Sequence, residues 1–377
     1  MESYGCRRIS SKQISYLKEK GIELKKRFKL LALVACLVML SSCVKNGGEE
    51  NKQAEQPAKT EETQTKTTGK IEDEPMYGKK IRIGYTGGLC TGAPGIAKVI
   101  GEYEKEGLDV EFVNVQSPID AIGAGKIDVL TTHIAELVVP ATNGINMTFV
   151  SGAQTGCKSL YVMNDGKINS TKDLVGKTVA IPGGVGSSDH NIALRFFNHD
   201  KIDPKDIKFK PVETSAVIQA MEKGEVGGVI LSDQFAEKFV KANKIKYIRS
   251  LTYDDDFKHE PCCMNAFNAN FIKENPQTAQ KVAKAIKRTQ LWIADNTEEA
   301  TKLLFDNNWA TGDFDQAVRM MKSYDWKISI DDTEKTLRNI YDDYKQFGII
   351  SSDKSTDELM EKYWNPLGVD ETVALNK

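Results

Sequence analysis

Short apolar runs alternate with amphipathic stretches through most of the chain from about residue 80. The run "KKIRIGY" places Ile81, Ile83 and Tyr85 at alternate positions, which favours a strand, and the glycine-rich "TGGLCTGAPG" that follows predicts a loop. The pattern then predicts a helix over 96–106, strands in "LDVEFVNV" and "KIDVLTT", and a helix over 134–142. Because strand and helix alternate, a parallel α/β sheet is expected.

The same rhythm restarts after "SLYVMND", in "GKTVAIPGGVGSSDHNIALRFF" and "GGVILSDQFAEKFV", which predicts a second α/β lobe. Beyond Cys263 the pattern becomes helical. Asn275 precedes Pro276 as a predicted N-cap, and Asn296 stands at capping-box spacing from Glu299. The expected fold is therefore two lobes, each a mostly parallel sheet flanked by helices, with a helical C-terminal extension.

The N-terminal region predicts export. A basic cluster at 25–29 precedes an apolar run at 30–40, which is too short to span a bilayer and is typical of a signal peptide. The following "LSSC" resembles a bacterial lipobox, so 1–42 are interpreted as an extension with a lipoprotein signal and Cys43 as the lipidated residue. The polar segment 43–78 is expected to be a disordered tether that holds the protein at the extracytoplasmic face of the bacterial cell membrane.

Composition argues against nucleic acid as a partner and leaves four cysteines in the folded part of the chain. The 377 residues carry a formal net charge of −2 with no basic stripe, so nucleic acid is not an expected partner. Of the seven cysteines, Cys90, Cys157, Cys262 and Cys263 fall in the folded part. Cys90 and His133 each follow a predicted strand, and open α/β sheets bind ligands beyond the carboxyl ends of their strands.

Four stretches carry a family resemblance: "GYTGGLCTGAPGIAKVIGEYEKEGLDVEFVNV", "GKIDVLTTHIAELVVPATNG", "DLVGKTVAIPGGVGSSDHNIALRFF" and "AVIQAMEKGEVGGVILSDQFAEKFV". Their order resembles the solute-binding proteins of the nitrate, sulfonate and taurine class of ABC importers, a class that includes proteins similar to thiamine-precursor binders. The resemblance covers about residues 79–300. Gly227 stands where the class often has Asp, which leaves its usual ligand recognition open.

That resemblance implies a type II-like periplasmic-binding-protein fold whose partners are an ABC permease and ATPase. Lobe one would hold 79–157 and return at 262–377 with the helical tail, and lobe two would hold 158–261. The lobes would hinge near 151–160 and 258–268 and close on a small molecule. Ligand contacts would lie at 89–93, 131–133, 183–188, and at Cys157 with 262–265.

The thiols suggest which ligand the cleft takes. Strand alternation would send Cys262 and Cys263 to opposite faces, one into the cleft and one into the core. Thiolates prefer soft cations such as cuprous ion or mercury. "GLCTGAP" with "EPCCMN" resembles the substrate-binding proteins of selenocysteine-assisted organometal transport systems. The resemblance implies an organometal ligand, such as an organomercurial, whose metal atom would be bound by Cys90, Cys262 and Cys263. The full set of expected ligand-binding residues is Cys90, Thr91, His133, Cys157, Ser187, Cys262 and Cys263.

Other interpretations stay open at this point. The cysteines can be incidental in a conventional sulfonate, nitrate, taurine or heterocycle binder, or Cys90 and Cys262 can form a disulfide across the cleft mouth. Zinc is a third possibility, although paired CxxC motifs are missing. The same fold also serves pyrimidine synthesis in the thiamine pathway, but export argues against that role. No nucleophile, base and orienting group occur together, so we expect neither catalysis nor a cofactor.

Overall fold

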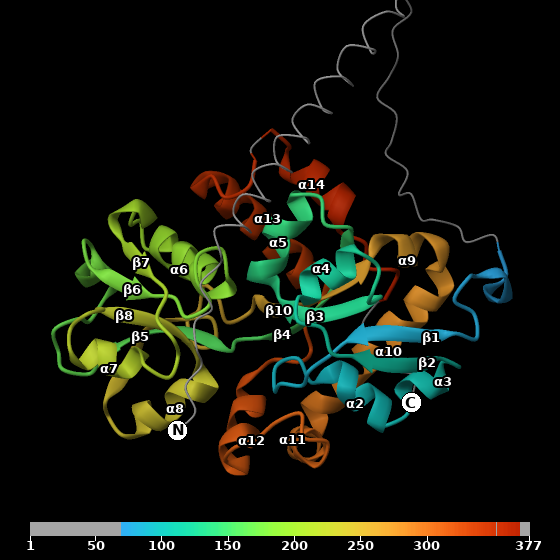
Figure 1. Ribbon diagram of the computed structural model, residues 1–377, viewed down its shortest axis with the longest axis horizontal. Coiled ribbons are helices and arrows are strands. Elements are labelled where there is room, and N and C mark those ends of the chain that lie inside the picture. The colour runs from blue at the N-terminus through green and yellow to red at the C-terminus, as the bar shows by residue number, and fades with distance from the viewer. Residues whose placement is uncertain (1–68, 352, 370–377) are drawn as a thin grey trace, which may run out of the picture. The chain divides into compact units, whose positions relative to one another are not determined.

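The computed structural model describes residues 69–351 and 353–369, which form two five-stranded sheets flanked by helices (Figure 1). The first sheet has the order β2-β1-β3-β10-β4, with β1 at Lys80–Gly84, β2 at Asp109–Val113, β3 at Val129–His133, β4 at Met147–Thr155 and β10 at Pro261–Asn268. The second has the order β7-β6-β8-β5-β9, with β5 at Lys158–Met163, β6 at Thr178–Ala180, β7 at Lys208–Lys210, β8 at Gly228–Ser232 and β9 at Ile245–Ser250.

Both sheets are mixed, but in each of them four strands run in one direction and one runs against them, so the prediction of mostly parallel sheets is confirmed even though half of the strand pairings are antiparallel. Strand β1 runs parallel to β2 and β3, whereas β10 runs antiparallel to β3 and β4. In the second sheet, β6 is parallel to β7 and β8, whereas β5 is antiparallel to β8 and β9. The antiparallel half arises because β5 and β10 each enter their sheet from the other lobe rather than after a local crossover helix.

Two segments connect the sheets. Strand β4 passes through Gly156 and Cys157 directly into β5, and the chain returns between β9 and β10 through residues 251–260. One buried apolar cluster continues across these connections, since it contains Ile83 of β1 as well as Leu160 of β5. The two sheets therefore share a core beside the connecting segments.

The helices cover both sheets and their bounds follow: α2 at Ala93–Val99, α3 at Glu102–Lys105, α4 at Pro118–Gly123, α5 at Ile134–Thr142, α6 at Ser188–His199, α7 at Val217–Glu222, α8 at Asp233–Lys241, α9 at Ala269–Glu274, α10 at Pro276–Asp295, α11 at Thr297–Asp306, α12 at Phe314–Ser323, α13 at Ile330–Phe347 and α14 at Thr356–Tyr363. In the C-terminal extension, α13 contacts β4 of the first sheet and also α6 of the second lobe, and α12 contacts α8. The extension thus packs against both lobes. Within the described residues, none of these helices has the length and apolar character that a membrane span needs.

Helix predictions succeed where the apolar period is clear. The helix predicted over 134–142 is confirmed. The one predicted over 96–106 is instead two short helices, because Gly101 adopts a φ of 77° and breaks the helical path. Asn275 and Asn296 do occupy N-cap positions, but neither side chain caps its helix as expected.

Glu74 supplies the cap that Asn275 does not. Its carboxylate accepts hydrogen bonds from the backbone N–H of Gln277 at 2.7 Å and from the backbone N–H and hydroxyl of Thr278 at 2.9 and 2.6 Å. The Asn275 amide oxygen accepts instead from the backbone N–H of Met76 at 2.8 Å. The end of the predicted tether, from residue 69 to residue 78, is therefore part of the fold. The Glu74 carboxylate caps the first turn of α10. Glu74 and α10 are distant in sequence, so composition alone does not reveal this pairing.

We expect Glu74→Ala to lower the free energy of unfolding by about 1–2 kcal/mol, the usual cost of removing a helix cap. The exposed Glu72 makes the matched control, since Glu72→Ala removes the same charge from the same segment. Urea denaturation of both variants measures the difference. Equal stabilities would mean that Glu74 does not hold α10.

Candidate functional site

Four side chains able to bind a metal meet where the connecting segments join the first sheet: His133, Cys157, Cys262 and Cys263. His133 ends β3, Cys157 lies between β4 and β5, and Cys262 and Cys263 open β10. One donor atom from each lies within 4.8 Å of every other. Three segments that are far apart in sequence, including both lobe connections, thus bring their donors to one place.

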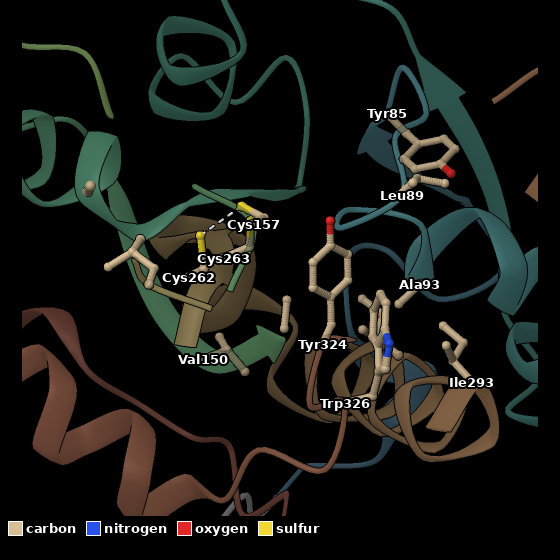
Figure 2. Packing of buried hydrophobic residues seen from close by; sticks show 14 of the residues in the cluster. Tyr85, Leu89, Ala93, Val150, Cys157, Cys262, Cys263, Ile293, Tyr324 and Trp326 are labelled. Carbon is tan, nitrogen blue, oxygen red and sulfur yellow. Dashed lines mark hydrogen bonds between the residues drawn. The ribbon is translucent and has the colours of Figure 1, made fainter. Parts of the chain in front are cut away.

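The distances from His133 to the three sulfur atoms suit a single ion, whereas the two sulfur atoms of Cys157 and Cys262 are closer together than ligands of one tetrahedral ion. The Cys157 and Cys262 sulfur atoms are 2.9 Å apart, and Figure 2 marks this contact. Nδ1 of His133 lies 3.3 Å from the sulfur of Cys262 and 3.9 Å from that of Cys263, and Nε2 lies 3.8 Å from the sulfur of Cys157. Tetrahedral ligands about 2.3 Å from a metal are about 3.8 Å from one another, so one ion can contact sulfur and nitrogen together.

Cys262 and Cys263 do not face opposite sides as strand alternation predicted. Both sulfur atoms approach His133, and both residues are buried. The reason is an irregular ladder: the register of β10 against β4 shifts between Pro261 and Cys263 and again between Cys263 and Met264. Such bulges re-aim side chains, and here they turn two adjacent thiols toward one site.

Cys90, in the loop after β1, was predicted as a metal ligand but is not among the four residues whose donor atoms lie within 4.8 Å of one another. The thiols of Cys157 and Cys263 nevertheless influence its pKa. Two glycines hold this loop against Trp309. Gly87 has a φ of 93°, and a Cβ atom at this position would lie 2.5 Å from the Trp309 carbonyl oxygen. Gly88 donates its N–H to the same oxygen at 2.7 Å. Only glycine fits so close to another backbone, and this fit fixes the loop that carries Cys90.

Cys157 holds an uncommon backbone conformation. Its φ is 89°, and the preceding Gly156 also has a positive φ of 83°. The conformation is held from both sides: the Cys157 N–H donates to the Thr252 hydroxyl at 2.9 Å, and its carbonyl accepts from the Asp233 N–H at 3.0 Å. The Thr252 hydroxyl in turn donates to the Asp233 carboxylate at 2.5 Å. Backbone strain retained by such bonds is typical of functional sites, and here it links the two lobe connections.

A buried cation lies next to the thiols. Lys158 follows Cys157, and its ammonium pairs with the Asp189 carboxylate and donates to the Ser188 hydroxyl at 3.0 Å. Burial alone would lower the pKa of Lys158, but Asp189 raises it above its ordinary value, with smaller contributions from Cys157 and Cys262. A charged lysine therefore stands where thiolate charge would develop.

The four thiols do not ionise alike. Burial raises the pKa of Cys157 and of Cys262 well above the ordinary thiol value. The pKa of Cys90 is also raised, since the lowering effect of Cys157 is outweighed by Cys263 and burial. Cys263 is the opposite case, because interactions with Cys157, Cys262 and Cys90 hold its pKa well below the ordinary value. Cys263 is therefore the thiol of the four that loses its proton most readily.

Two other predicted ligand residues use their hydroxyls within their own loops. Thr91 donates to the Gly87 carbonyl at 2.9 Å, and Ser187 donates to the Gly184 carbonyl at 2.7 Å while accepting from the His190 N–H as N-cap of α6. Cys43 lies outside the described residues. The four described cysteines are free, so the disulfide between Cys90 and Cys262 that the sequence left open is not formed.

Sequence reasoning missed several residues around the thiols. Lys158 could have been noticed as a lysine beside a cysteine at a lobe connection. Thr252 and Tyr324 carry no such local signal. Tyr324 is buried, and the centre of its ring lies 6.2 Å from that of Trp326 (Figure 2). Its pKa is raised well above the ordinary value by burial and then by the cysteines.

A small cavity adjoins Cys262 between the lobes. Its volume is about 20 Å³, and α6 of the second lobe and α13 of the extension both line it. A cavity of that size holds no more than a water molecule. The cavity beside Cys262 therefore has room for a water molecule but not for an organic ligand.

Comparison with known proteins places this architecture in a fold and a family. The solved periplasmic nitrate-binding protein NrtA from Synechocystis PCC 6803 superposes with a TM-score of 0.62 at 15% identity, covering 76% of this chain and 86% of that one. The chain therefore has the α/β periplasmic-binding-protein fold. It belongs to the NMT1/THI5-like family, whose model matches residues 96–300.

Its relatives carry names of two kinds. The 4-amino-5-hydroxymethyl-2-methylpyrimidine phosphate synthase THI13 of Saccharomyces cerevisiae is 22% identical over 228 residues, which are 56% of this chain and 65% of the yeast protein. The match thus spans slightly less than two thirds of that enzyme. The formylaminopyrimidine-binding protein of Halalkalibacterium halodurans is 19% identical over 289 residues, 75% of this chain and 79% of the relative. An enzyme and a binding protein are thus both similar to this chain.

Proposed function

We propose that this protein is the substrate-binding protein of an ABC importer and that it closes its two lobes on a small thiophilic ligand, an organometal such as an organomercurial. One observation carries the proposal: His133, Cys157, Cys262 and Cys263 bring their donor atoms within 4.8 Å of one another. Cys90 lies outside this set, but the thiols of Cys157 and Cys263 influence its pKa. Sulfur-rich sites of this kind select soft cations over cations that prefer oxygen.

The location of the thiols supports a binding protein that closes. Cys157 and Cys262 each stand at a connection between the lobes. An ion that bonds to both would fix the geometry of the two connections at once, so ligand binding and lobe closure would be coupled. In the proposed cycle, closure hands the ligand to a membrane permease driven by an ATPase. The protein itself would be anchored through Cys43 at the extracytoplasmic face of the membrane.

The relatives favour binding over synthesis. The match to the formylaminopyrimidine-binding protein covers 79% of that protein, against 65% of the yeast synthase, and the structural neighbour NrtA is named as a nitrate-binding protein. A conventional binder of nitrate, a sulfonate or a heterocycle is the competing proposal. In that case the thiols would be incidental, although their convergence around His133 then has no function to explain it.

Calorimetry with ethylmercury tests the proposal. The full chain is used with Cys6, Cys36 and Cys43 replaced by serine, so that four thiols remain. We expect one tight equivalent, and we expect Cys90→Ser and Cys262→Ser each to weaken binding by about a hundredfold, because even indirect partners of a metal site change affinity about 10–100-fold.

Nitrate, taurine and a formylaminopyrimidine serve as comparison ligands in the same experiment. Tight binding of one of them, unaffected by the two serine substitutions, would establish the conventional binder instead. Unchanged ethylmercury affinity in either variant would remove that cysteine from the site. Native mass spectrometry with and without ethylmercury verifies the stoichiometry.

A further inference from the structure

Gln154 is a buried polar residue that the fold does not explain. It lies near the end of β4 and is completely buried. Neither its amide nitrogen nor its amide oxygen has a hydrogen-bond partner among the described residues. Burying both atoms without partners costs free energy, and a leucine would fill similar volume without that cost. A fully buried unpartnered amide therefore calls for a binding partner that the protein itself does not supply.

The position of Gln154 relates it to the thiol cluster. In the antiparallel pairing of β4 with β10, Gln154 stands opposite Cys263, and Cys263 stands opposite His133 across the pairing of β10 with β3. Opposite residues of antiparallel strands face the same side, with Cβ atoms about 4.5–5.5 Å apart. Gln154, Cys263 and His133 therefore form one row across three strands.

Gln290 adds a second unpartnered atom in the same region. This α10 residue is also completely buried, and its amide nitrogen donates to the carbonyls of Gly152 and Ala153 at 3.0 and 2.8 Å. Those two bonds fix the orientation of the amide. Its oxygen is left without a partner beside the segment of β4 that leads to Gln154. The unpartnered atoms of the two glutamines are the donor nitrogen of Gln154 and two acceptor oxygens, one from each residue.

We propose that Gln154 recognises a hydroxyl group on the organic part of the thiol-bound ligand. This inference rests on the proposed function and narrows its ligand class. A hydroxyl donates to one amide oxygen and accepts from the amide nitrogen of Gln154, whereas a carboxylate can only accept and would leave both amide oxygens unpaired. The substrate class is then a small organometal in which the hydroxyl lies a few bonds from the metal, because Gln154 stands directly across from Cys263.

Ethylmercury and 2-hydroxyethylmercury, which differ by one hydroxyl, make the test. Their relative affinities are measured by competition with a small dithiol, in the full chain that keeps the four cluster cysteines. We expect the unsubstituted site to prefer the hydroxylated compound by about tenfold, the ratio that corresponds to one net hydrogen bond. Gln154→Leu should abolish that preference, leave ethylmercury affinity within about twofold, and leave the melting temperature of the free protein unchanged or raised.

Each other result overturns the inference. Equal binding of both compounds by the unsubstituted protein would mean that a structural water satisfies the amides. A preference that survives in Gln154→Leu would assign hydroxyl recognition to another residue. Should the leucine variant fail to fold, Gln154→Met offers an unbranched apolar chain of similar length for the same comparison. Failure to bind ethylmercury at all would instead refute the proposed function, which the first titration reveals separately.

Discussion

Replacing Cys263 with serine is expected to weaken ethylmercury binding by more than a hundredfold, the largest effect of any single thiol. Cys263 ionises more readily than the other three thiols, since its thiol neighbours hold its pKa well below the ordinary value. A thiolate can give its electron pair to mercury at once, whereas a neutral thiol must first lose a proton. A second-sphere partner is typically worth about 10–100-fold in affinity, so loss of the thiolate itself should exceed that range.

The adjacent Met264 makes the matched control for this substitution. Met264 is also buried and contains sulfur, but it packs in a different apolar cluster from the one that holds Cys263. Met264→Leu should therefore leave the affinity for ethylmercury nearly unchanged. Isothermal titration calorimetry compares the two variants, and a loss of similar size in both would indicate a general packing effect instead of a lost ligand.

Proton release during the same titration tests the ionisation of the cluster. If Cys263 and a second cysteine bind the metal and Cys263 is already ionised at neutral pH, only the second thiol loses a proton, so about one proton should be released. Because the pKa of Cys263 is depressed, affinity should fall as pH falls through that lowered value. The raised pKa of Cys157 and Cys262 means that affinity should rise as the pH climbs toward their values. Titration in buffers of different ionisation enthalpy counts the protons.

The sequence predicted the fold because the signals for it are local. Alternating apolar residues and glycine loops repeat twice, and each repeat corresponds to one sheet, as with Ile81 and Ile83 in β1. The antiparallel halves were not predictable, since the direction of β5 and β10 depends on which lobe the chain has just left. Periodicity specifies a strand without specifying its neighbours.

The thiol site was predictable only in part. Glycine loops and strand ends indicated the neighbourhood of Cys90 and His133, but the shared orientation of Cys262 and Cys263 depends on register shifts that involve β4. The pairing of Lys158 with Asp189 and that of Gln154 with Cys263 join segments that are distant in sequence. Such contacts leave no periodic trace, whereas cysteine itself is rare enough to attract attention.

A second large effect is expected at Arg195, a buried cation that connects three parts of the fold. From α6 it donates to Glu260 at 2.8 and 3.3 Å, just before β10, and to Asp343 of α13 at 2.7 Å. Its side chain is only 5% exposed. Although burial opposes it, contacts with His199 and with Arg195 hold the pKa of Asp343 below its ordinary value, so that carboxylate remains charged. The second lobe, the return connection and the C-terminal extension thus share one ion-pair network.

Arg195→Met should lower the free energy of unfolding by about 3–5 kcal/mol, because it leaves two largely buried carboxylates without their cation. Arg338 provides the control: it also pairs with two carboxylates, Glu334 and Asp357, but its side chain is 39% exposed. Arg338→Met should cost less than about 1 kcal/mol, as exposed ion pairs usually do. Urea denaturation followed by circular dichroism measures both. Adding Glu260→Gln and Asp343→Asn to Arg195→Met should recover much of the lost unfolding free energy, since neutral amides do not need the cation. If no stability is recovered, the loss comes from the packing of the arginine side chain instead of its charge.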